Sequence, residues 1–289
     1  NPGPPPGDND SRIPFRTLVT RTLDTAEDAL LHLRRIPYEF GLLPERSADG
    51  RKTVIVLGSG WAAHAVLKVA DTYKLRIIVV SPSNHFVFTP MLASAAVGTV
   101  EYRSMTEAVR AANPMIENYL EGTAVDIDVE KQIVKVKLQD LLADLREGEP
   151  PEVQVPYDQL IVAVGCKVAD SLVKGAKENS LRLKTVNDAR RLRDVVGESL
   201  EYASRPDVMD STQLPEPERA ARRKERRRRL TFAIVGGGPT GVELAGELAD
   251  FLKDVTKPRA GTHPKLRDDV RVVLVHGGED LVPQFDKDL

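Results

Sequence analysis

The sequence has almost no cysteine. Cys166 is the single one in 289 residues, so no disulfide can form within the chain and no Cys-x-x-Cys pair exists. A dithiol redox site and a cysteine-rich metal site are therefore excluded within this sequence. Cys166 itself is expected to be a small buried side chain, because thiol redox cycling needs a resolving cysteine.

Long apolar runs and a strong net charge are also missing. No apolar stretch approaches the roughly 18 to 20 residues that span a bilayer, so the sequence predicts no transmembrane helix. The 41 basic and 43 acidic residues give a net charge of -2, which provides no field that would favour nucleic acid as a partner. The histidines do not have metal-ligand spacing, and no metal site is assigned.

Residues 1–50 form a predicted N-terminal extension. Residues 1–10 are rich in proline and glycine, which favours a disordered tail. Residues 11–23 combine three arginines with hydroxyl residues and no acid, a composition found both in organelle transit peptides and in solvated connecting arms. A short helix is predicted over residues 25–33.

From residue 51 the pattern is that of a packed α/β fold. Thr53 to Leu57 is a β-branched run typical of a buried strand, a helix is predicted from Trp61 to about Tyr73, and Leu75 to Val80 supplies the next strand. This β-α-β unit indicates a parallel sheet. Residues 132–138 alternate apolar and charged side chains, which favours a half-exposed antiparallel strand, and residues 160–164 return to the buried type.

The turn between the first strand and helix carries a G-x-G-x-x-A motif, residues 58–63. Gly58 permits the tight turn, Gly60 lets the backbone approach a pyrophosphate, and Ala63 keeps the helix close to the sheet. The N–H groups of the helix N-terminus would face the phosphates. Ser81 stands where an acid usually holds the ribose hydroxyls, and its own hydroxyl can still bond a ribose.

A second motif, G-x-G-x-x-G, spans residues 236–241. It follows a strand predicted as buried over Thr231 to Val235 and precedes a helix predicted over residues 242–252. A strand over residues 270–275 would complete this unit and places His276 at its end. An acid there would favour NADH over NADPH, and histidine favours neither strongly, so nucleotide preference stays open.

The segment before the second motif is a predicted helix over residues 187–202, a proline-containing linker over 204–216 and a charge run. Eight of the eleven residues from Arg219 to Arg229 are basic. Such a run suits either a nucleic-acid or anionic-lipid patch or a solvated helix face. The solvated face is preferred, because glutamates are interspersed and aromatic residues are absent.

Two dinucleotide loops in one chain suit a resident cofactor and a visiting one. A strand over residues 157–165 would return the chain to the first nucleotide. The predicted fold is α/β with two Rossmann-like (FAD/NAD(P)-binding) domains, the second interrupting the first, incomplete at the C-terminus. The predicted division is an FAD domain over residues 51–185, a helix and charged linker over 186–229, and an NAD(P)H domain over 230–289.

From residue 52 to 289 the sequence resembles the type II (alternative, rotenone-insensitive) NAD(P)H dehydrogenases of the plant, fungal and algal branch. Besides the glycine loops, residues 79–90, 98–104 and 285–289 carry the resemblance. A serine at the position of Ser81 is usual in that branch, so the missing acid supports the resemblance.

The resemblance implies the following cofactor-binding residues. FAD would be held by Gly58, Gly60, Trp61, Ala62, Ala63, Ser81, Thr89, Pro90, Val164 and Gly165. NADH or NADPH would be lined by Gly236, Gly237, Gly238, Pro239, Thr240, Gly241 and His276. Glu243 would lie near the flavin and the electron acceptor, and it is the one candidate for proton handling. Its alternative role is a first-turn carboxylate that stabilises the helix dipole.

The implied activity is that of an FAD-dependent NAD(P)H:quinone oxidoreductase of the non-proton-pumping respiratory type. The implied partners are a quinone, a membrane bound peripherally through a region after Leu289, and a second copy in a homodimer, with no nucleic acid. The implied location is the mitochondrial inner membrane, with the plastid as alternative. Two other functions stay open: a nucleotide-binding remnant or regulatory partner without quinone turnover, and a soluble flavoprotein reductase with a protein acceptor, which the Thr89-Pro90 segment disfavours.

Overall fold

The computed structural model describes residues 50–72, 74–139, 151–168, 173–209, 214–285. Contacts divide the chain into Asn1–Arg51 and Lys52–Leu289, and the second unit contains the fold described below. The tail, the arginine-containing segment and the helix predicted before residue 50 lie outside the described residues.

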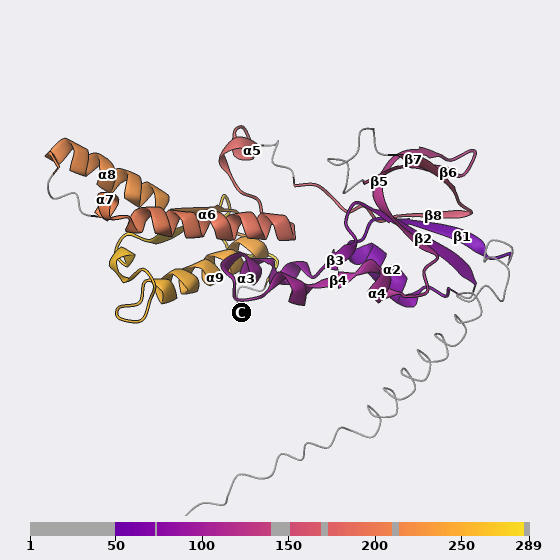
Figure 1. Cartoon of the computed structure of the whole chain (residues 1–289), viewed down its shortest axis with the longest axis horizontal. Coiled ribbons are helices and arrows are strands. Elements are labelled where there is room, and N and C mark those ends of the chain that lie inside the picture. The colour runs from indigo at the N-terminus through magenta and orange to yellow at the C-terminus, as the bar shows by residue number, and fades with distance from the viewer. Residues whose placement is uncertain (1–49, 73, 140–150, 169–172, 210–213, 286–289) are drawn as a thin grey trace, which may run out of the picture. The chain divides into compact units, whose positions relative to one another are not determined.

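A six-stranded sheet forms the first half of this unit (Figure 1), with strand order β7-β6-β5-β2-β1-β8. Its strands are β1 (Lys52–Leu57), β2 (Leu75–Ser81), β5 (Asn118–Asp128), β6 (Ile133–Leu138), β7 (Glu152–Pro156) and β8 (Gln159–Val162). The strands β5, β2, β1 and β8 run parallel, and β5, β6 and β7 are antiparallel neighbours. The predicted α/β fold with a parallel β-α-β unit is confirmed, and so is the antiparallel strand at 132–138.

Both faces of the sheet are covered, because successive side chains of a strand point to opposite sides. Val54 and Val56 of β1 pack against Leu67 of helix α2 (Trp61–Val69). Ile55 and Leu57 point the other way and pack against valines of β6 and β7. The first glycine loop, between β1 and α2, is thus fixed to a core that is closed on both sides.

The chain between β2 and β5 leaves the sheet and returns. It contains β3 (His85–Val87), η2 (Thr89–Met91), α3 (Leu92–Val97), η3 (Tyr102–Met105), β4 (Thr106–Ala108) and α4 (Val109–Ala112). Strands β3 and β4 pair as an antiparallel ribbon. Helix α3 ends at Gly98, whose φ of 86° lies in the left-handed region that glycine adopts readily.

The later elements are α5 (Ala176–Asn179), α6 (Val186–Ser204), α7 (Pro206–Met209), α8 (Glu216–Arg229), β9 (Thr231–Val235), α9 (Pro239–Val255), η6 (Pro264–Leu266) and β10 (Arg271–Val275). Helix α6 begins with a capping box between Thr185 and Asp188, which satisfies two backbone donors at the helix start. Strands β9 and β10 pair in parallel with α9 between them in sequence, as predicted for the second β-α-β unit.

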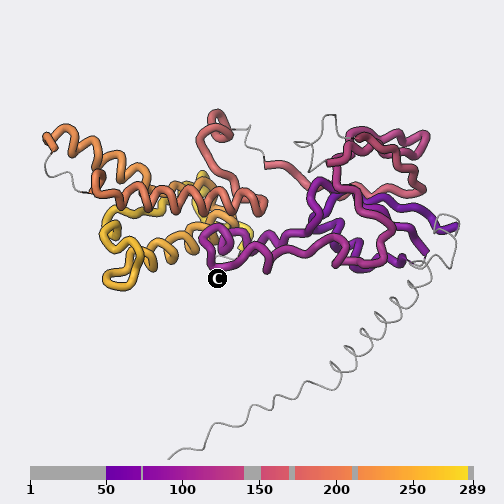
Figure 2. The backbone as a smooth tube through the Cα atoms, in the orientation of Figure 1, coloured from indigo at the N-terminus to yellow at the C-terminus, as the bar shows by residue number. Residues whose placement is uncertain are grey.

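Helix α3 packs against α6 and α9, although they are far apart in sequence (Figure 2). Leu92, Ala93 and Ala96 join a core cluster with Ala189 of α6 and Leu244 of α9. The small side chains of α3 allow this close packing of helices. The predicted domain boundaries, between residues 185 and 186 and between residues 229 and 230, stay predictions.

Several predicted details are wrong. Helix α2 ends at Val69 rather than near Tyr73, because Ala70 is extended and Asp71 then accepts two hydrogen bonds in a turn before β2. The predicted linker over 204–216 contains the short helix α7. The helix predicted over residues 242–252 is confirmed within α9. The charge run, predicted as a charged linker, forms helix α8, which has no buried residue.

The burial of three predicted segments is also wrong. Val162 and Val164 are largely exposed, since β8 is an edge strand of its sheet. Val235 is 84% exposed, since β9 lies in a two-stranded sheet rather than between other strands. Cys166, expected to be buried, is exposed.

Replacement of Ile55 by alanine tests the central position of β1. Ile55 is fully buried, so I55A should lower the free energy of unfolding by about 2 to 5 kcal/mol through lost burial and a cavity. The matched control V129A removes methyl groups from a 73% exposed side chain and should change stability by less than about 0.5 kcal/mol. Equal urea midpoints for both variants would contradict this position of β1 in the core.

Candidate functional site

The first glycine loop depends on a close approach between two backbone segments. Gly58 has a φ of +112°, and a Cβ placed on it would overlap the carbonyl group of Ala163, just after β8. The N–H of Gly58 donates to the carbonyl of Val80, 2.8 Å away. Gly58 is therefore required by the protein's own packing, since no L side chain fits at this turn.

Gly60 differs from Gly58 because nothing lies near it. A Cβ on Gly60 would meet no atom within 4 Å, and its φ of −79° suits any residue. Gly60 is the N-cap of α2 and no side chain caps this helix end, so the first N–H groups of Trp61, Ala62 and Ala63 have no intrahelical partner. The open space and the free helix end together suit a phosphate group. Ala63 is fully buried against the sheet.

Ser81, predicted to contact a ribose, is tied to the glycine loop. Its Oγ donates to the Oγ of Ser59 at 3.0 Å and accepts the N–H of Ser83 at 3.2 Å. Both serines are buried. The Ser59–Ser81 bond joins the loop after β1 to the end of β2, which is a role for Ser59 that the motif alone did not indicate. Tyr119 donates its hydroxyl to the Ser81 carbonyl, and burial, with the nearby negative charge of Glu121, raises the pKa of that hydroxyl.

Trp61 and Thr89, two predicted FAD residues from different segments, lie together. The indole N–H of Trp61 donates to the Oγ1 of Thr89 at 3.1 Å. The Trp61 ring meets Phe86 edge-on at 4.9 Å between centroids and also contacts Phe88. Trp61 remains 51% exposed, so the aromatic cluster presents an open face. Pro90 follows Thr89 within the short helix η2.

A second layer of residues supports this aromatic cluster. His64 stacks on Phe86 at 4.2 Å, and its Nε2 lies 3.3 Å from a carboxylate oxygen of Glu107. The other oxygen of Glu107 accepts from Lys68 at 2.7 Å. Glu107 of strand β4 is thereby bound to two residues of helix α2, the helix that also carries Trp61. No single residue of this layer was indicated by the sequence, because its members come from two distant segments.

Val164 and Gly165 follow β8 beside Gly58. The backbone N–H of Ala163 donates to the carbonyl of Leu57, and Gly165 has a φ of +68° with open space where a Cβ would lie. The first loop therefore contacts two other segments: the Thr89 segment through Trp61, and the chain after β8 through Gly58. Cys166 follows directly, and the Nζ of Lys184 donates to its sulfur at 3.1 Å.

The second glycine loop repeats the first in its backbone requirements. Gly236 has a φ of +119°, and its N–H donates to the carbonyl of Val275. A Cβ on Gly241 would overlap the carbonyl of Gly236. Gly238 is the N-cap of α9 without a side-chain cap, and Pro239 occupies the first turn, where its missing N–H costs nothing. Thr240 is exposed in the first turn of the same helix.

His276 is part of the second loop. Its Nδ1 accepts the N–H of Gly237 at 3.1 Å, and a Cβ on Gly237 would clash with the imidazole ring. Since Nδ1 is the acceptor, the proton of the neutral ring lies on Nε2. The carbonyl of Gly237 accepts from Val282. His276 therefore fixes the loop while standing at the end of β10, as predicted.

Glu243 is exposed on α9 and makes no hydrogen bond or ion pair with the described residues. It lies beyond the first turn of a helix that begins at Pro239, and no acid occupies that turn. The alternative role as a first-turn carboxylate is therefore wrong. The neighbouring acid on α9, Glu247, accepts from the hydroxyls of Ser94 at 2.6 Å and Thr99 at 3.2 Å. Sequence reasoning missed Glu247, whose partners lie about 150 positions away.

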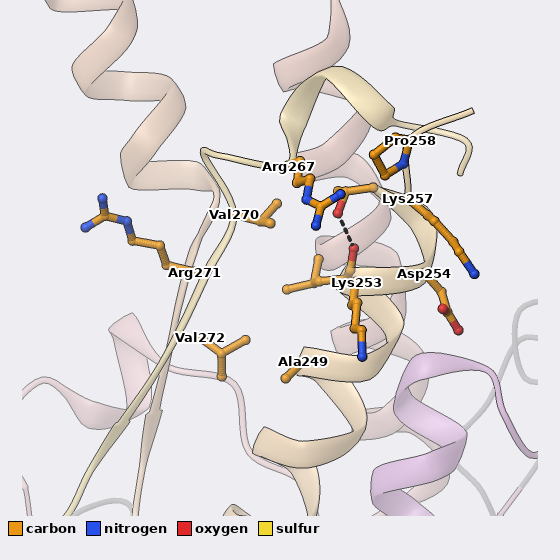
Figure 3. A pocket seen from close by; sticks show the side chains of 11 residues that line it. Ala249, Lys253, Asp254, Lys257, Pro258, Arg267, Val270, Arg271 and Val272 are labelled. Carbon is orange, nitrogen blue, oxygen red and sulfur yellow. Dashed lines mark hydrogen bonds between the residues drawn. The ribbon is translucent and has the colours of Figure 1, made fainter. Parts of the chain in front are cut away.

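A cavity of about 650 Å³ lies away from both loops (Figure 3). Ala249, Leu252, Val270 and Val272 form its apolar wall between α9 and β10, and basic side chains such as Lys253 and Arg267 stand around it. None of the predicted cofactor residues lines it. In the described residues no group of three or more histidine, cysteine, aspartate and glutamate side chains is placed to hold a metal ion. Among the described helices, none has both the length and the hydropathy that a membrane crossing requires.

Both loops lie within the part of the chain that matches a known protein family. The profile of the family described as pyridine nucleotide-disulphide oxidoreductase matches residues 52–289. Over 247 residues the chain is 38% identical to the mitochondrial external alternative NADH-ubiquinone oxidoreductase of Yarrowia lipolytica, covering 83% of this chain and 38% of that protein. Over 239 residues it is 36% identical to the mitochondrial external alternative NAD(P)H-ubiquinone oxidoreductase B2 of Arabidopsis thaliana, covering 82% and 38%.

The solved structure of NDH2 from Plasmodium falciparum in complex with NADH is similar with a TM-score of 0.68 and 27% identity, covering 82% of this chain and 44% of that one. These proteins confirm the resemblance to the alternative NAD(P)H dehydrogenases. The chain spans about 38% of the length of the two curated relatives.

Two glycines of α9 provide a matched test of the second loop. A methyl group at Gly241 overlaps the Gly236 carbonyl, whereas Gly246 has open space around it. G241A should therefore displace the loop, lower the free energy of unfolding by more than about 1 kcal/mol, and weaken nucleotide binding. G246A should raise stability by about 0.5 to 1 kcal/mol, as expected for alanine in a helix interior. Urea unfolding and calorimetric titration with NADH measure both effects, and an unchanged G241A would refute the close approach.

Proposed function

The chain belongs to the pyridine nucleotide-disulphide oxidoreductase family, and we propose that it acts in an FAD-dependent NAD(P)H:quinone oxidoreductase. The observation that carries the proposal is the pair of uncapped helix starts, at Gly60 and Gly238, each behind a glycine loop with a positive φ. Two such loops in one chain suit two dinucleotides, and the names of the relatives in Yarrowia lipolytica and Arabidopsis thaliana supply the quinone acceptor.

The first loop fits FAD. The N-terminus of α2 would hold the pyrophosphate, because its N–H groups have no other partner and Gly60 leaves the space open. The Ser59–Ser81 bond keeps the loop at the end of β2, where a ribose would lie. The bond between Trp61 and Thr89 would fix the Thr89-Pro90 segment at the cofactor's side. When bound, FAD supplies the two-electron chemistry between a reduced nicotinamide and a quinone.

The second loop fits NADH or NADPH. The N-terminus of α9 would hold the pyrophosphate of the nucleotide, and Gly236 and Gly241 keep the turn tight enough for it. Glu243 is proposed to hold or release a proton near the acceptor, as an exposed carboxylate without a competing partner in the described residues. The mechanism requires no nucleophile from the chain, since its residues bind and orient the two redox partners.

The proposal includes a location. The relatives from Yarrowia lipolytica and Arabidopsis thaliana are named as mitochondrial proteins, and we propose the mitochondrion for this protein, with peripheral association at the inner membrane. A lipid-soluble quinone is reached only from a membrane surface, which favours this association. A homodimer is also part of the proposal, and sedimentation of the purified protein tests it.

Replacement of Gly60 by alanine separates cofactor binding from folding. The purified protein should show the visible absorption of an oxidised flavin, which should bleach under anaerobic NADH or NADPH and return when a quinone is added. G60A should fold with unchanged stability, because the methyl group meets no protein atom, yet lose at least about 90% of the bound flavin if a pyrophosphate approaches this backbone.

The single tryptophan of the chain gives an independent measure of the same site. Trp61 lies directly after Gly60, so adding FAD to flavin-stripped protein should quench its fluorescence in the wild type and not in G60A. G246A serves as the control for an alanine in a helix far from this loop. A G60A protein that keeps its flavin would refute the site, and a colourless wild type that still binds NADH would favour the nucleotide-binding remnant.

Substitution of His276 tests its role in nucleotide preference. A glutamate can keep the hydrogen bond from Gly237, since a carboxylate oxygen accepts, and it would repel a 2′-phosphate. H276E should therefore raise the ratio of kcat/KM for NADH over NADPH by about tenfold, which corresponds to about 1.4 kcal/mol. H276Q keeps an acceptor without the charge and serves as control. If both variants change the ratio equally, charge at this position does not select the nucleotide.

A further inference from the structure

Helix α8 has a charge opposite to that of the rest of the chain. Its residues, Glu216–Arg229, include eight basic and three acidic side chains. The remainder of the sequence contains 33 basic and 40 acidic residues. The near-neutral net charge of the chain is therefore the sum of one strongly basic helix and an acidic remainder. The field of such a concentrated charge is felt over about a Debye length, 8 to 10 Å.

One side of α8 is fixed to the protein. Arg226 forms an ion pair with Asp269 at 2.9 Å, in which both side chains are more than 80% buried. Arg222 donates to the backbone carbonyl of Asp207, and Arg226 also contacts the sulfur of Met209. These contacts hold α8 against α7 and against the segment before β10. The helix is therefore a fixed element, and its opposite side faces away from these partners.

The other side of α8 carries cations in excess of their partners. Arg223, Lys224, Arg227 and Arg228 are all exposed. Glu225 accepts from both Arg228 and Arg229, and these bonds lower the pKa of Glu225 to about 2. In the described part of the chain, the side chains of Lys224 and Arg227 make no hydrogen bond or ion pair. The cations of Lys224 and Arg227 therefore leave this face with a net positive charge.

The same face has charged side chains but no aromatic or large apolar ones. Its uncharged side chains are Pro217, Ala220 and Ala221, and α8 contains no aromatic residue. Without aromatic rings it lacks the stacking surfaces typical of single-strand nucleic-acid sites, and without large apolar residues it cannot insert among lipid chains. A straight helix of about 21 Å, which follows from 14 residues at 1.5 Å each, can lie along a flat charged surface.

We propose that α8 binds the anionic head groups of a lipid bilayer through Lys224, Arg227 and the arginines beside them. The choice of a bilayer rests on the proposed function, because a quinone acceptor is dissolved in a membrane. Clusters of four to eight Lys and Arg on a helix are typical of such surfaces, and each cation contributes about 1 kcal/mol near an anionic leaflet. Binding through α8 is purely electrostatic and is reversed by salt.

The test is sedimentation of the purified protein with vesicles, in the absence of nucleotide and quinone. The wild type should bind vesicles containing about one third phosphatidylserine and leave neutral phosphatidylcholine vesicles unbound, and raising the salt from about 50 to about 300 mM should release it. K224Q/R227Q should bind the anionic vesicles about 30-fold more weakly, as expected for two lost cations at about 1 kcal/mol each. Glutamine is a good helix former, so α8 should stay folded.

The matched control is K137Q/K177Q, which removes the same charge from two exposed lysines whose side chains make no hydrogen bond or ion pair with the described residues. It should bind like the wild type. Equal losses in both double variants would show a response to net charge alone and overturn the proposal. Tighter binding of a 20-base-pair DNA duplex than of the vesicles, at equal salt, would also overturn it. Since no redox step is measured, loss of flavin or quinone activity leaves this result unaffected, and failure here leaves the proposed reaction standing.

Discussion

The structure depends on backbone segments that approach each other more closely than any side chain would allow. Gly58 lies against the carbonyl of Ala163, and Gly241 lies against the carbonyl of Gly236. The first contact joins the turn after β1 to the end of β8, and the second closes the turn before α9. In both places a glycine with a positive φ begins the turn, and the helix that follows starts without a side-chain cap. The packing contacts and the proposed ligand contacts therefore lie within the same few residues of each loop.

Those features could be predicted from sequence because they are local. The glycine spacing, the β-branched run before each loop and the helix after it all lie within about ten residues of Gly58 or Gly236, and their chemistry does not depend on distant residues. Ser59 shows where local reasoning ends. Its motif position is variable, and its bond to Ser81 across 22 positions becomes visible only when β1 and β2 lie side by side.

Contacts between distant segments could not be predicted. The bond between Ser94 and Glu247 crosses 153 positions, and no periodicity in either helix indicates the other as its neighbour. The prediction of which residues are buried was wrong for a related reason. The apolar run after Gln159 predicts a strand correctly, but only the strand order shows that β8 is at an edge and leaves Val162 exposed. A sequence pattern describes one element, whereas exposure depends on what lies next to it.

The composition of the two loops indicates which part of the chemistry the protein can perform and which part a bound ligand must supply. Between Gly58 and Ala63, and between Gly236 and Gly241, no side chain can gain or lose a proton near neutral pH. The two loops offer backbone N–H groups, helix dipoles and one aromatic face at Trp61, which are suited to bind and orient charged ligands but cannot transfer electrons. Any redox activity must therefore come from what these loops hold. The backbone at Gly58 and Gly241 is accordingly fixed by close contacts with neighbouring carbonyl groups. The exposed carboxylate of Glu243, by contrast, is bound by no other residue in the described structure.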